Sequence, residues 1–206
     1  MEFSAYNIVL IVASLVVAIT IHEAMHAYVS NWLGDPTARD EGRVTLNPAP
    51  HIDPFMTILL PVVLVALSQP PILAARPVPF NPNRVRFEEF GAALVGISGP
   101  FINLVLAVLS ALTLGLLQPD FGSVPRDILL VFTQINVALF VFNMLPLPPL
   151  DGSRLVYALA PDPVRRVMEQ IEQLGIVAII AILFLLLPFI GPVIENLNDY
   201  ILRVLV

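Results

Sequence analysis

The feature that most constrains this sequence is a set of long stretches without charge. Residues 4–21 carry no charged side chain, and as a helix they would span about 27 Å, close to the hydrocarbon thickness of a bilayer. Residues 92–117, 128–145 and 176–190 are similar. Charged residues make up only 13% of the chain, against roughly a quarter in soluble domains. We therefore predict an all-α polytopic membrane protein, a single domain of residues 1–206 with about four full transmembrane helices.

The first helix is expected to continue past its uncharged part, through His22 to Leu33. Gly34 is typical of the residue that ends a helix, because glycine adopts left-handed backbone angles without strain. Trp32 marks the membrane interface, where amphipathic aromatic rings are enriched. The polar residues from His22 onward are therefore predicted to lie inside the membrane, near one surface.

Four shorter segments are predicted between and after these spans. Residues 55–73 are apolar but too short and too rich in proline for a full crossing, so we expect a re-entrant hairpin. Residues 43–46 are expected to form a short β-like segment, and residues 163–173 a short amphipathic helix. Residues 192–206 fit either an interfacial helix or a further span.

The motif His22-Glu23-x-x-His26 lies on the first helix. Residues four apart share one helix face, so both imidazoles can reach a single zinc ion, and Glu23 can accept a proton from the attacking water. Trp32 places the motif roughly 9 Å below the membrane surface. Ionisable side chains at that depth are costly unless they have a role, which favours a metal site over a solvated helix end.

A catalytic zinc usually has three protein ligands. The chain has no cysteine, so the third ligand is expected to be an oxygen donor or the remaining histidine. Asp151 is the best candidate, because it follows an apolar span in a proline-rich segment and precedes Gly152, which allows a sharp turn. His51 and Asp53 are alternatives that we interpret as a surface loop or cap, and Glu195 is interpreted as solvated.

Three motifs in this order resemble the site-2 protease family of intramembrane metalloproteases, in its short prokaryotic form: His22-Glu23-x-x-His26, Gly99-Pro100-x-x-Asn103 and Asn143-x-x-Pro146-x-x-Pro149-Leu150-Asp151-Gly152. The joint pattern is far more specific than the first motif alone. Asn103 fits a site residue and a helix-packing amide equally well.

The resemblance implies that His22, His26 and Asp151 bind zinc and that Glu23 is the catalytic base. It also implies that Asn143 lies near the site and holds substrate backbone. The substrate would be the transmembrane segment of a membrane-bound protein, such as a regulator. The chain has no room for a PDZ or CBS domain, so any regulatory module is expected to come from a separate partner.

The two parts of the site must meet on one side of the membrane. His26 lies near the exit of the first span and Asp151 at the exit of residues 128–145, so an even number of crossings separates them. Residues 55–73 therefore cannot cross once. Most arginines then share one side, which the positive-inside rule makes cytoplasmic: Arg39, Arg43, Arg76, Arg84, Arg86, Arg154, Arg165 and Arg166, against Arg126 and Arg203 opposite. We predict a prokaryotic inner-membrane protein with its site near the cytoplasmic face.

Other functions fit less well. With 16 acidic against 10 basic residues and no basic cluster, the chain is not expected to bind nucleic acid. A metal transporter or non-proteolytic zinc-binding protein would use intramembrane His and Asp, but the spans carry few other polar residues, and Glu23 would lack a role. An inactive scaffold is disfavoured because all four key residues are present. Residues 43–46 could pair with an unwound substrate by edge addition.

Overall fold

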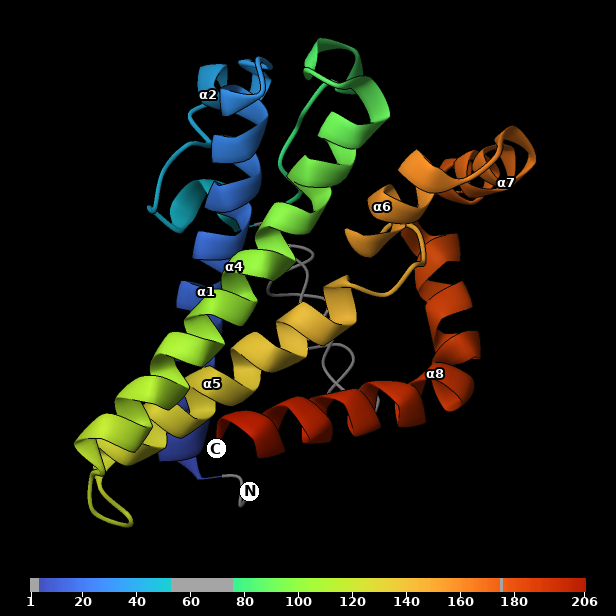
Figure 1. Cartoon of the computed structure of the whole chain (residues 1–206). Helices are drawn as coiled ribbons and strands as arrows, with labels where there is room; N and C mark the ends of the chain where they lie inside the picture. The colour runs from blue at the N-terminus through green and yellow to red at the C-terminus, as the bar shows by residue number, and fades with distance from the viewer. Residues whose placement is uncertain (1–3, 53–75, 175) are drawn as a thin grey trace.

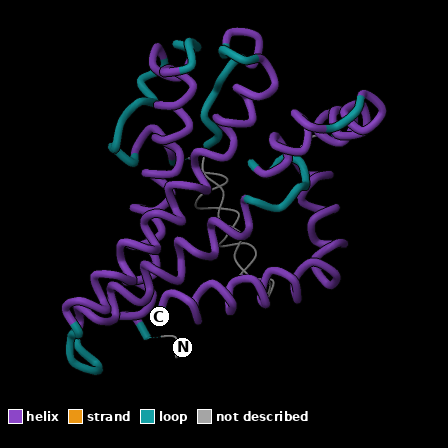
Figure 2. Tube along the Cα trace, viewed as in Figure 1, coloured by secondary structure: helices purple, strands orange, loops and turns teal. Residues whose placement is uncertain are grey.

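The computed structural model describes residues 4–52, 76–174 and 176–206, and within these ranges it is helical without strands (Figure 2). The predicted re-entrant hairpin lies outside the described residues. Within the described residues, three helices, α1, α4 and α5, are long and apolar enough to cross a membrane. The described elements are α1 (Ala5–Trp32), α2 (Thr37–Asp40), η1 (Ala49–His51), η3 (Pro82–Arg84), α4 (Glu88–Leu117), α5 (Val124–Asn143), α6 (Gly152–Leu159), α7 (Asp162–Gln173) and α8 (Ile176–Leu205).

Helix α4 is the centre of the bundle, with α1 and α5 packed against it (Figure 1). Helix α1 begins where the Ser4 hydroxyl accepts a hydrogen bond from the backbone N–H of Asn7 at 3.2 Å. It ends at Trp32 because Gly34, two residues on, adopts a φ of +111°. The predicted extent of the first helix is therefore confirmed, and its C-terminal half carries the histidine motif.

The prediction of a β-like segment at residues 43–46 is wrong. The backbone N–H of Thr45 donates to the carbonyl of Arg43 at 2.9 Å, which closes a tight turn. The Arg43 guanidinium also donates to the carbonyls of Arg76 and Pro77, at 2.5 and 3.3 Å, and so fixes the turn by contacts distant in sequence. No strand is available here to pair with substrate, and the edge-addition idea has no basis in the described structure.

The C-terminal third contains the predicted amphipathic helix as α7 and then one long helix, α8. Figure 1 shows α8 bending part-way along, and its interior prolines, Pro188 and Pro192, are the expected cause, because proline removes a helical hydrogen bond. Its last turns fold back onto α4 and α5. The side chains that pack there are Ile194, Ile201, Leu202 and Leu205, around Ala107, Val137 and Val141.

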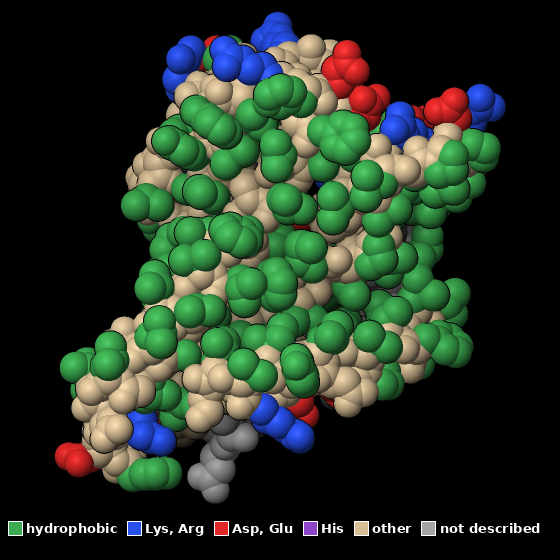
Figure 3. All heavy atoms as spheres, viewed as in Figure 1, with side chains coloured by type: hydrophobic (Ala, Val, Ile, Leu, Met, Phe, Trp, Pro, Cys, Tyr) green, Lys and Arg blue, Asp and Glu red, His purple; other side chains and the backbone are tan. Residues whose placement is uncertain are grey.

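The surface of the molecule matches a bilayer. Figure 3 shows hydrophobic side chains covering the middle of the visible face, with charged side chains gathered at its two ends. Large apolar side chains such as Phe101 and Leu112 are more than half exposed, at 60% and 57%. An apolar surface this extensive would be a liability in water, so we interpret the band as the lipid-facing surface.

Candidate metal centre

His22 and His26 lie one turn apart on α1 and face the same point. Their Nε2 atoms are 3.0 Å apart, and the two rings are nearly perpendicular, at 82°. Both side chains are buried between α1 and α4. The helical spacing of the motif predicted this shared face.

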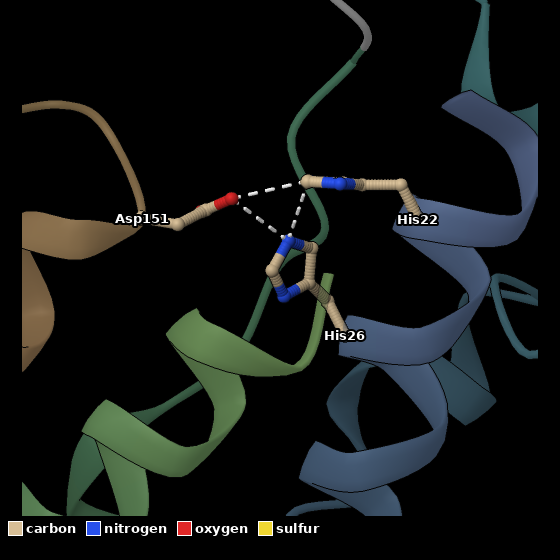
Figure 4. A group of neighbouring side chains, drawn as sticks. All are labelled: His22, His26 and Asp151. Carbon is tan, nitrogen blue, oxygen red and sulfur yellow. Dashed lines mark hydrogen bonds and ion pairs between the residues drawn. The ribbon is translucent and has the colours of Figure 1, made fainter. Parts of the chain in front are cut away.

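Asp151 completes the group and faces the two histidines from a different segment of the chain (Figure 4). It lies at the end of the loop that follows α5, directly before α6. Its Oδ2 is 3.0 Å from Nε2 of His22 and 3.3 Å from Nε2 of His26. Two glycines permit this approach: a Cβ on Gly96 would lie 3.0 Å from the Asp151 carbonyl oxygen, and one on Gly152 would strike the Met144 carbonyl.

The outer nitrogens of both imidazoles are also bonded. Nδ1 of His22 lies 2.5 Å from the side-chain oxygen of Asn103, and Nδ1 of His26 lies 2.7 Å from the carbonyl oxygen of Val95. Both partners are oxygen acceptors, so Nδ1 carries the hydrogen in each neutral ring. Each Nε2 is then left with a free lone pair directed at the centre of the group.

This arrangement fits zinc. Two imidazole nitrogens and a carboxylate oxygen converge with no hydrogen between them, which calls for a cation. Ligand atoms about 2.0–2.1 Å from a tetrahedral zinc lie about 3.3 Å from one another. The observed separations are 3.0, 3.0 and 3.3 Å. The donor types and their spacing, with both histidines buried and Asp151 half-buried, therefore suit a three-ligand zinc site.

Gly99 is a site residue that the sequence analysis did not single out. A Cβ at this position would strike Nε2 of His26 and lie 2.6 Å from Nε2 of His22. Only glycine leaves room for both imidazoles beneath α4. The available signal was its place in the second motif, four residues before Asn103, which the structure bonds to His22.

Glu23 and Asn143 are the remaining predicted site residues. Glu23 follows His22 directly and is 9% exposed, and within the described residues its carboxylate makes no hydrogen bond or ion pair. It acts electrostatically on His26 and Arg43. Asn143 ends α5, and its amide donates to the Leu139 carbonyl at 3.0 Å. Its predicted contact with substrate stays a prediction.

The two alternative ligands that the structure describes, His51 and Glu195, are not part of the group. His51 is 1% exposed, and its Nε2 bonds the Thr45 carbonyl at 3.0 Å, so the interpretation of His51 as a surface residue is wrong. Asp53 lies outside the described residues, and Glu195 is exposed on α8, as expected.

Comparisons with known proteins identify the family. Residues 121–187 match the model of peptidase family M50. YwhC of Bacillus subtilis (strain 168), a candidate zinc metalloprotease by name, is 39% identical over 199 residues, covering 93% of this chain and 83% of YwhC. The chain belongs to peptidase family M50.

More distant relatives agree. Rip2 of Mycolicibacterium smegmatis, also a candidate zinc metalloprotease by name, is 28% identical over 182 residues, covering 85% of this chain and 66% of Rip2. Rip2 of Mycobacterium tuberculosis (strain H37Rv) is 25% identical over 188 residues, covering 91% and 69%. No solved structure gives a significant match. Membership of M50, the site-2 protease family, confirms the prediction of an intramembrane zinc metalloprotease.

Proposed function

We propose that this chain hydrolyses peptide bonds within transmembrane segments of membrane-bound proteins, with His22, His26 and Asp151 as the zinc ligands and Glu23 as the general base. The observation that carries the proposal is the convergence of two imidazole nitrogens and one carboxylate oxygen within 4.8 Å of one another. When bound, zinc supplies Lewis-acid activation of water and of the scissile carbonyl.

The position and surroundings of Glu23 support its proposed role as the general base. Its carboxylate follows a ligand on the same helix and has no hydrogen-bonding partner in the described parts of the chain. A carboxylate oxygen of Glu23 accepts the proton of the attacking water and passes it to the nitrogen of the leaving amine. Asn143, at the end of the helix that leads to Asp151, is proposed to hold the substrate backbone through its side-chain amide.

The site is proposed to lie near the cytoplasmic face of a prokaryotic inner membrane. The C-terminal end of α1, the N-terminal end of α4, and α6 and α7 lie at one end of the molecule (Figure 1). Arginines gather at that end, and few lie at the other (Figure 3), which the positive-inside rule associates with the cytoplasm.

The flanks of residues 53–75 support the same topology. The backbone N–H of Arg76 donates to the carbonyl of His51 at 2.9 Å, so the chain leaves and returns at one place. We also propose that a separate protein partner supplies any regulation.

The test compares the wild-type chain with Glu23→Gln, purified in detergent, for zinc content and for cleavage of a transmembrane substrate. The variant keeps all three ligands, so we expect unchanged zinc content and a loss of cleavage of about 10²–10⁴-fold. Glu195→Gln, which changes an exposed carboxylate of α8, is the control and should cleave normally.

Two results would contradict the proposal. If Glu23→Gln cleaved as fast as the wild type, Glu23 would not be the base. If the wild type bound zinc but cleaved none of a panel of transmembrane substrates, a transporter or scaffold would be the better interpretation.

A further inference from the structure

Two buried amides link the metal-site histidine to the third spanning helix. Asn103 of α4 accepts from Nδ1 of His22 through its Oδ1, at 2.5 Å, and donates through its Nδ2 to Oδ1 of Asn136 on α5, at 2.8 Å. Asn136 in turn donates to the Phe132 carbonyl of its own helix at 2.8 Å. Both asparagines are 0% exposed, so no bulk water competes for these bonds.

The direction of this chain of hydrogen bonds is fixed from its far end. An asparagine side chain can present either its oxygen or its amino group to a neighbour. The Phe132 carbonyl is only an acceptor, so the amino group of Asn136 faces Phe132 and its oxygen faces Asn103. The amino group of Asn103 donates to Asn136 at 2.8 Å and, over a longer 3.4 Å, to the Ala18 carbonyl of α1, so its oxygen is left for His22.

We propose that Asn136 is a positioning residue for the metal centre. Asn136 accepts the shorter of the two bonds that the Asn103 amino group donates, and so holds that amide in the orientation that keeps the hydrogen of His22 on Nδ1 and the lone pair on Nε2, where the metal would bind. If the amide of Asn103 turned over, its amino group would face Nδ1 and favour the tautomer that carries hydrogen on Nε2 and cannot bind metal. The inference rests on the proposed role of His22 as a ligand.

The three residues of this hydrogen-bonded chain come from three different helices. Asn136 belongs to α5, the helix that leads into the loop of Asp151, whereas His22 belongs to α1 and Asn103 to α4. The amide chain therefore ties together the three spanning helices that build the centre. A role in helix packing alone would also bury two amides, so the test must separate packing from metal binding.

The experiment measures the zinc affinity of the purified full chain in detergent by competition with a chromophoric chelator. Asn136→Leu removes the nearer of the two acceptors of the Asn103 amino group and leaves the Ala18 carbonyl, at 3.4 Å, while filling a similar volume. We expect zinc to bind about 10–100-fold more weakly, the usual effect of losing an outer partner of a ligand. Ser110→Ala is the matched control: Ser110 of α4 bonds the Leu129 carbonyl of α5 at 3.0 Å and has no link to His22. Its zinc affinity should be unchanged.

A second substitution tests whether Asn136 acts through the orientation of the Asn103 amide. A carboxylate presents an oxygen to His22 whichever way it turns, so Asn103→Asp combined with Asn136→Leu should bind zinc more tightly than Asn136→Leu alone. The proposal is overturned if this rescue fails, if Asn136→Leu keeps wild-type affinity, or if Ser110→Ala loses as much affinity as Asn136→Leu.

Two further results remain informative. If Asn136→Leu does not fold, Asn136→Asp replaces it, because its carboxyl still accepts from Asn103; wild-type affinity is then expected, and a large loss in a folded protein would overturn the inference. If the wild-type chain binds no zinc, the proposed function fails, and this inference fails with it.

Discussion

Two buried polar clusters in this molecule use their hydrogen-bonding groups differently. In the metal-site cluster (His22, His26 and Asp151), both outer ring nitrogens are bonded, and the free lone pairs meet at one point. In the loop cluster (Arg43 and His51), two guanidinium nitrogens and one ring nitrogen have no partner within the described residues. Its bonded nitrogens reach backbone carbonyls instead.

The difference shows that convergence of acceptor atoms, and not burial alone, identifies a metal site. Burial of polar side chains is common to both clusters, since Arg43 is 2% exposed and His51 1%. Convergence of acceptor atoms is found only in the metal-site cluster, among the described residues. We therefore interpret the loop cluster as structural. It joins the chain before residue 53 to the chain after residue 75, and we assign it no ligand.

The largest effect is expected from Gly99→Ala. Alanine in place of glycine within a helix normally stabilises by about 1 kcal/mol. Here the added methyl group would occupy the space of both imidazole Nε2 atoms, so His22 and His26 must move apart. We expect loss of zinc binding and of cleavage, at least as severe as the roughly 10–100-fold cost of losing an outer partner, measured by zinc content and substrate turnover.

Gly115→Ala provides the matched control for this prediction. Gly115 lies on the same helix, and a Cβ there would have nothing within 4 Å. It should bind zinc normally and be slightly more stable. If Gly99→Ala bound zinc normally, the centre would tolerate displacement of both imidazoles. Precise convergence would then no longer distinguish the metal-site cluster from the loop cluster.

An intermediate effect is expected from Arg43→Met, which acts on the loop cluster. The substitution removes the bonds to the carbonyls of Arg76 and Pro77 but also removes two buried nitrogens, Nε and Nη1, that have no partner within the described residues. We expect the free energy of unfolding to fall by about 1–3 kcal/mol, because bonds to a charged group usually outweigh the gain from removing such nitrogens.

Zinc affinity should remain at the wild-type value in Arg43→Met, because Arg43 bonds none of the metal ligands. The measurements are denaturant unfolding in detergent and chelator competition on the same preparation. If Arg43→Met lost zinc but kept its stability, the loop cluster would have to be counted as part of the site.

The sequence was sufficient to predict that His22, His26 and Asp151 converge, because the two histidines are related by local helix geometry and Asp151 follows an apolar span. His22 and His26 are brought together by one turn of helix, and the apolar runs required helices that enclose them. Asp151 could be identified because an acidic residue that follows an apolar span, in a proline-rich segment at membrane depth, is costly unless it binds a cation. The motifs of the family contain the same three residues.

The contacts that support these ligands could not be predicted, because they join residues far apart in the chain. Nothing local to Asn103 reveals that Asn136 orients it, or that Gly99 must leave space for two rings. The β-like prediction at residues 43–46 failed for the same reason: the local preference of Val44 and Thr45 for strands is weaker than the bonds that Arg43 makes to Arg76 and Pro77.

The smallest effect is expected from Asp35→Asn, at the end of α1 and outside both clusters. Its carboxylate accepts from the backbone and hydroxyl of Thr37, at 3.1 and 2.6 Å, and from the backbone of Asn81 at 2.5 Å. Burial alone would raise the pKa of Asp35, but these hydrogen bonds outweigh it, and the pKa lies below its ordinary value of about 3.9. Because the folded pKa is the lower one, the carboxylate stabilises the fold above about pH 4, and this contribution is lost as pH falls through the folded pKa.

We expect Asp35→Asn to lower the free energy of unfolding by about 1 kcal/mol at neutral pH and to flatten its fall below about pH 4. Denaturant unfolding in detergent between neutral and acid pH measures both. Asp40→Asn is the control, because Asp40 is exposed and, among the described residues, its side chain pairs only with its neighbour Arg39. If the two variants gave the same pH dependence, the bonds from Thr37 and Asn81 would add nothing to stability, and the join between α1 and the loop before η3 would depend on apolar packing alone.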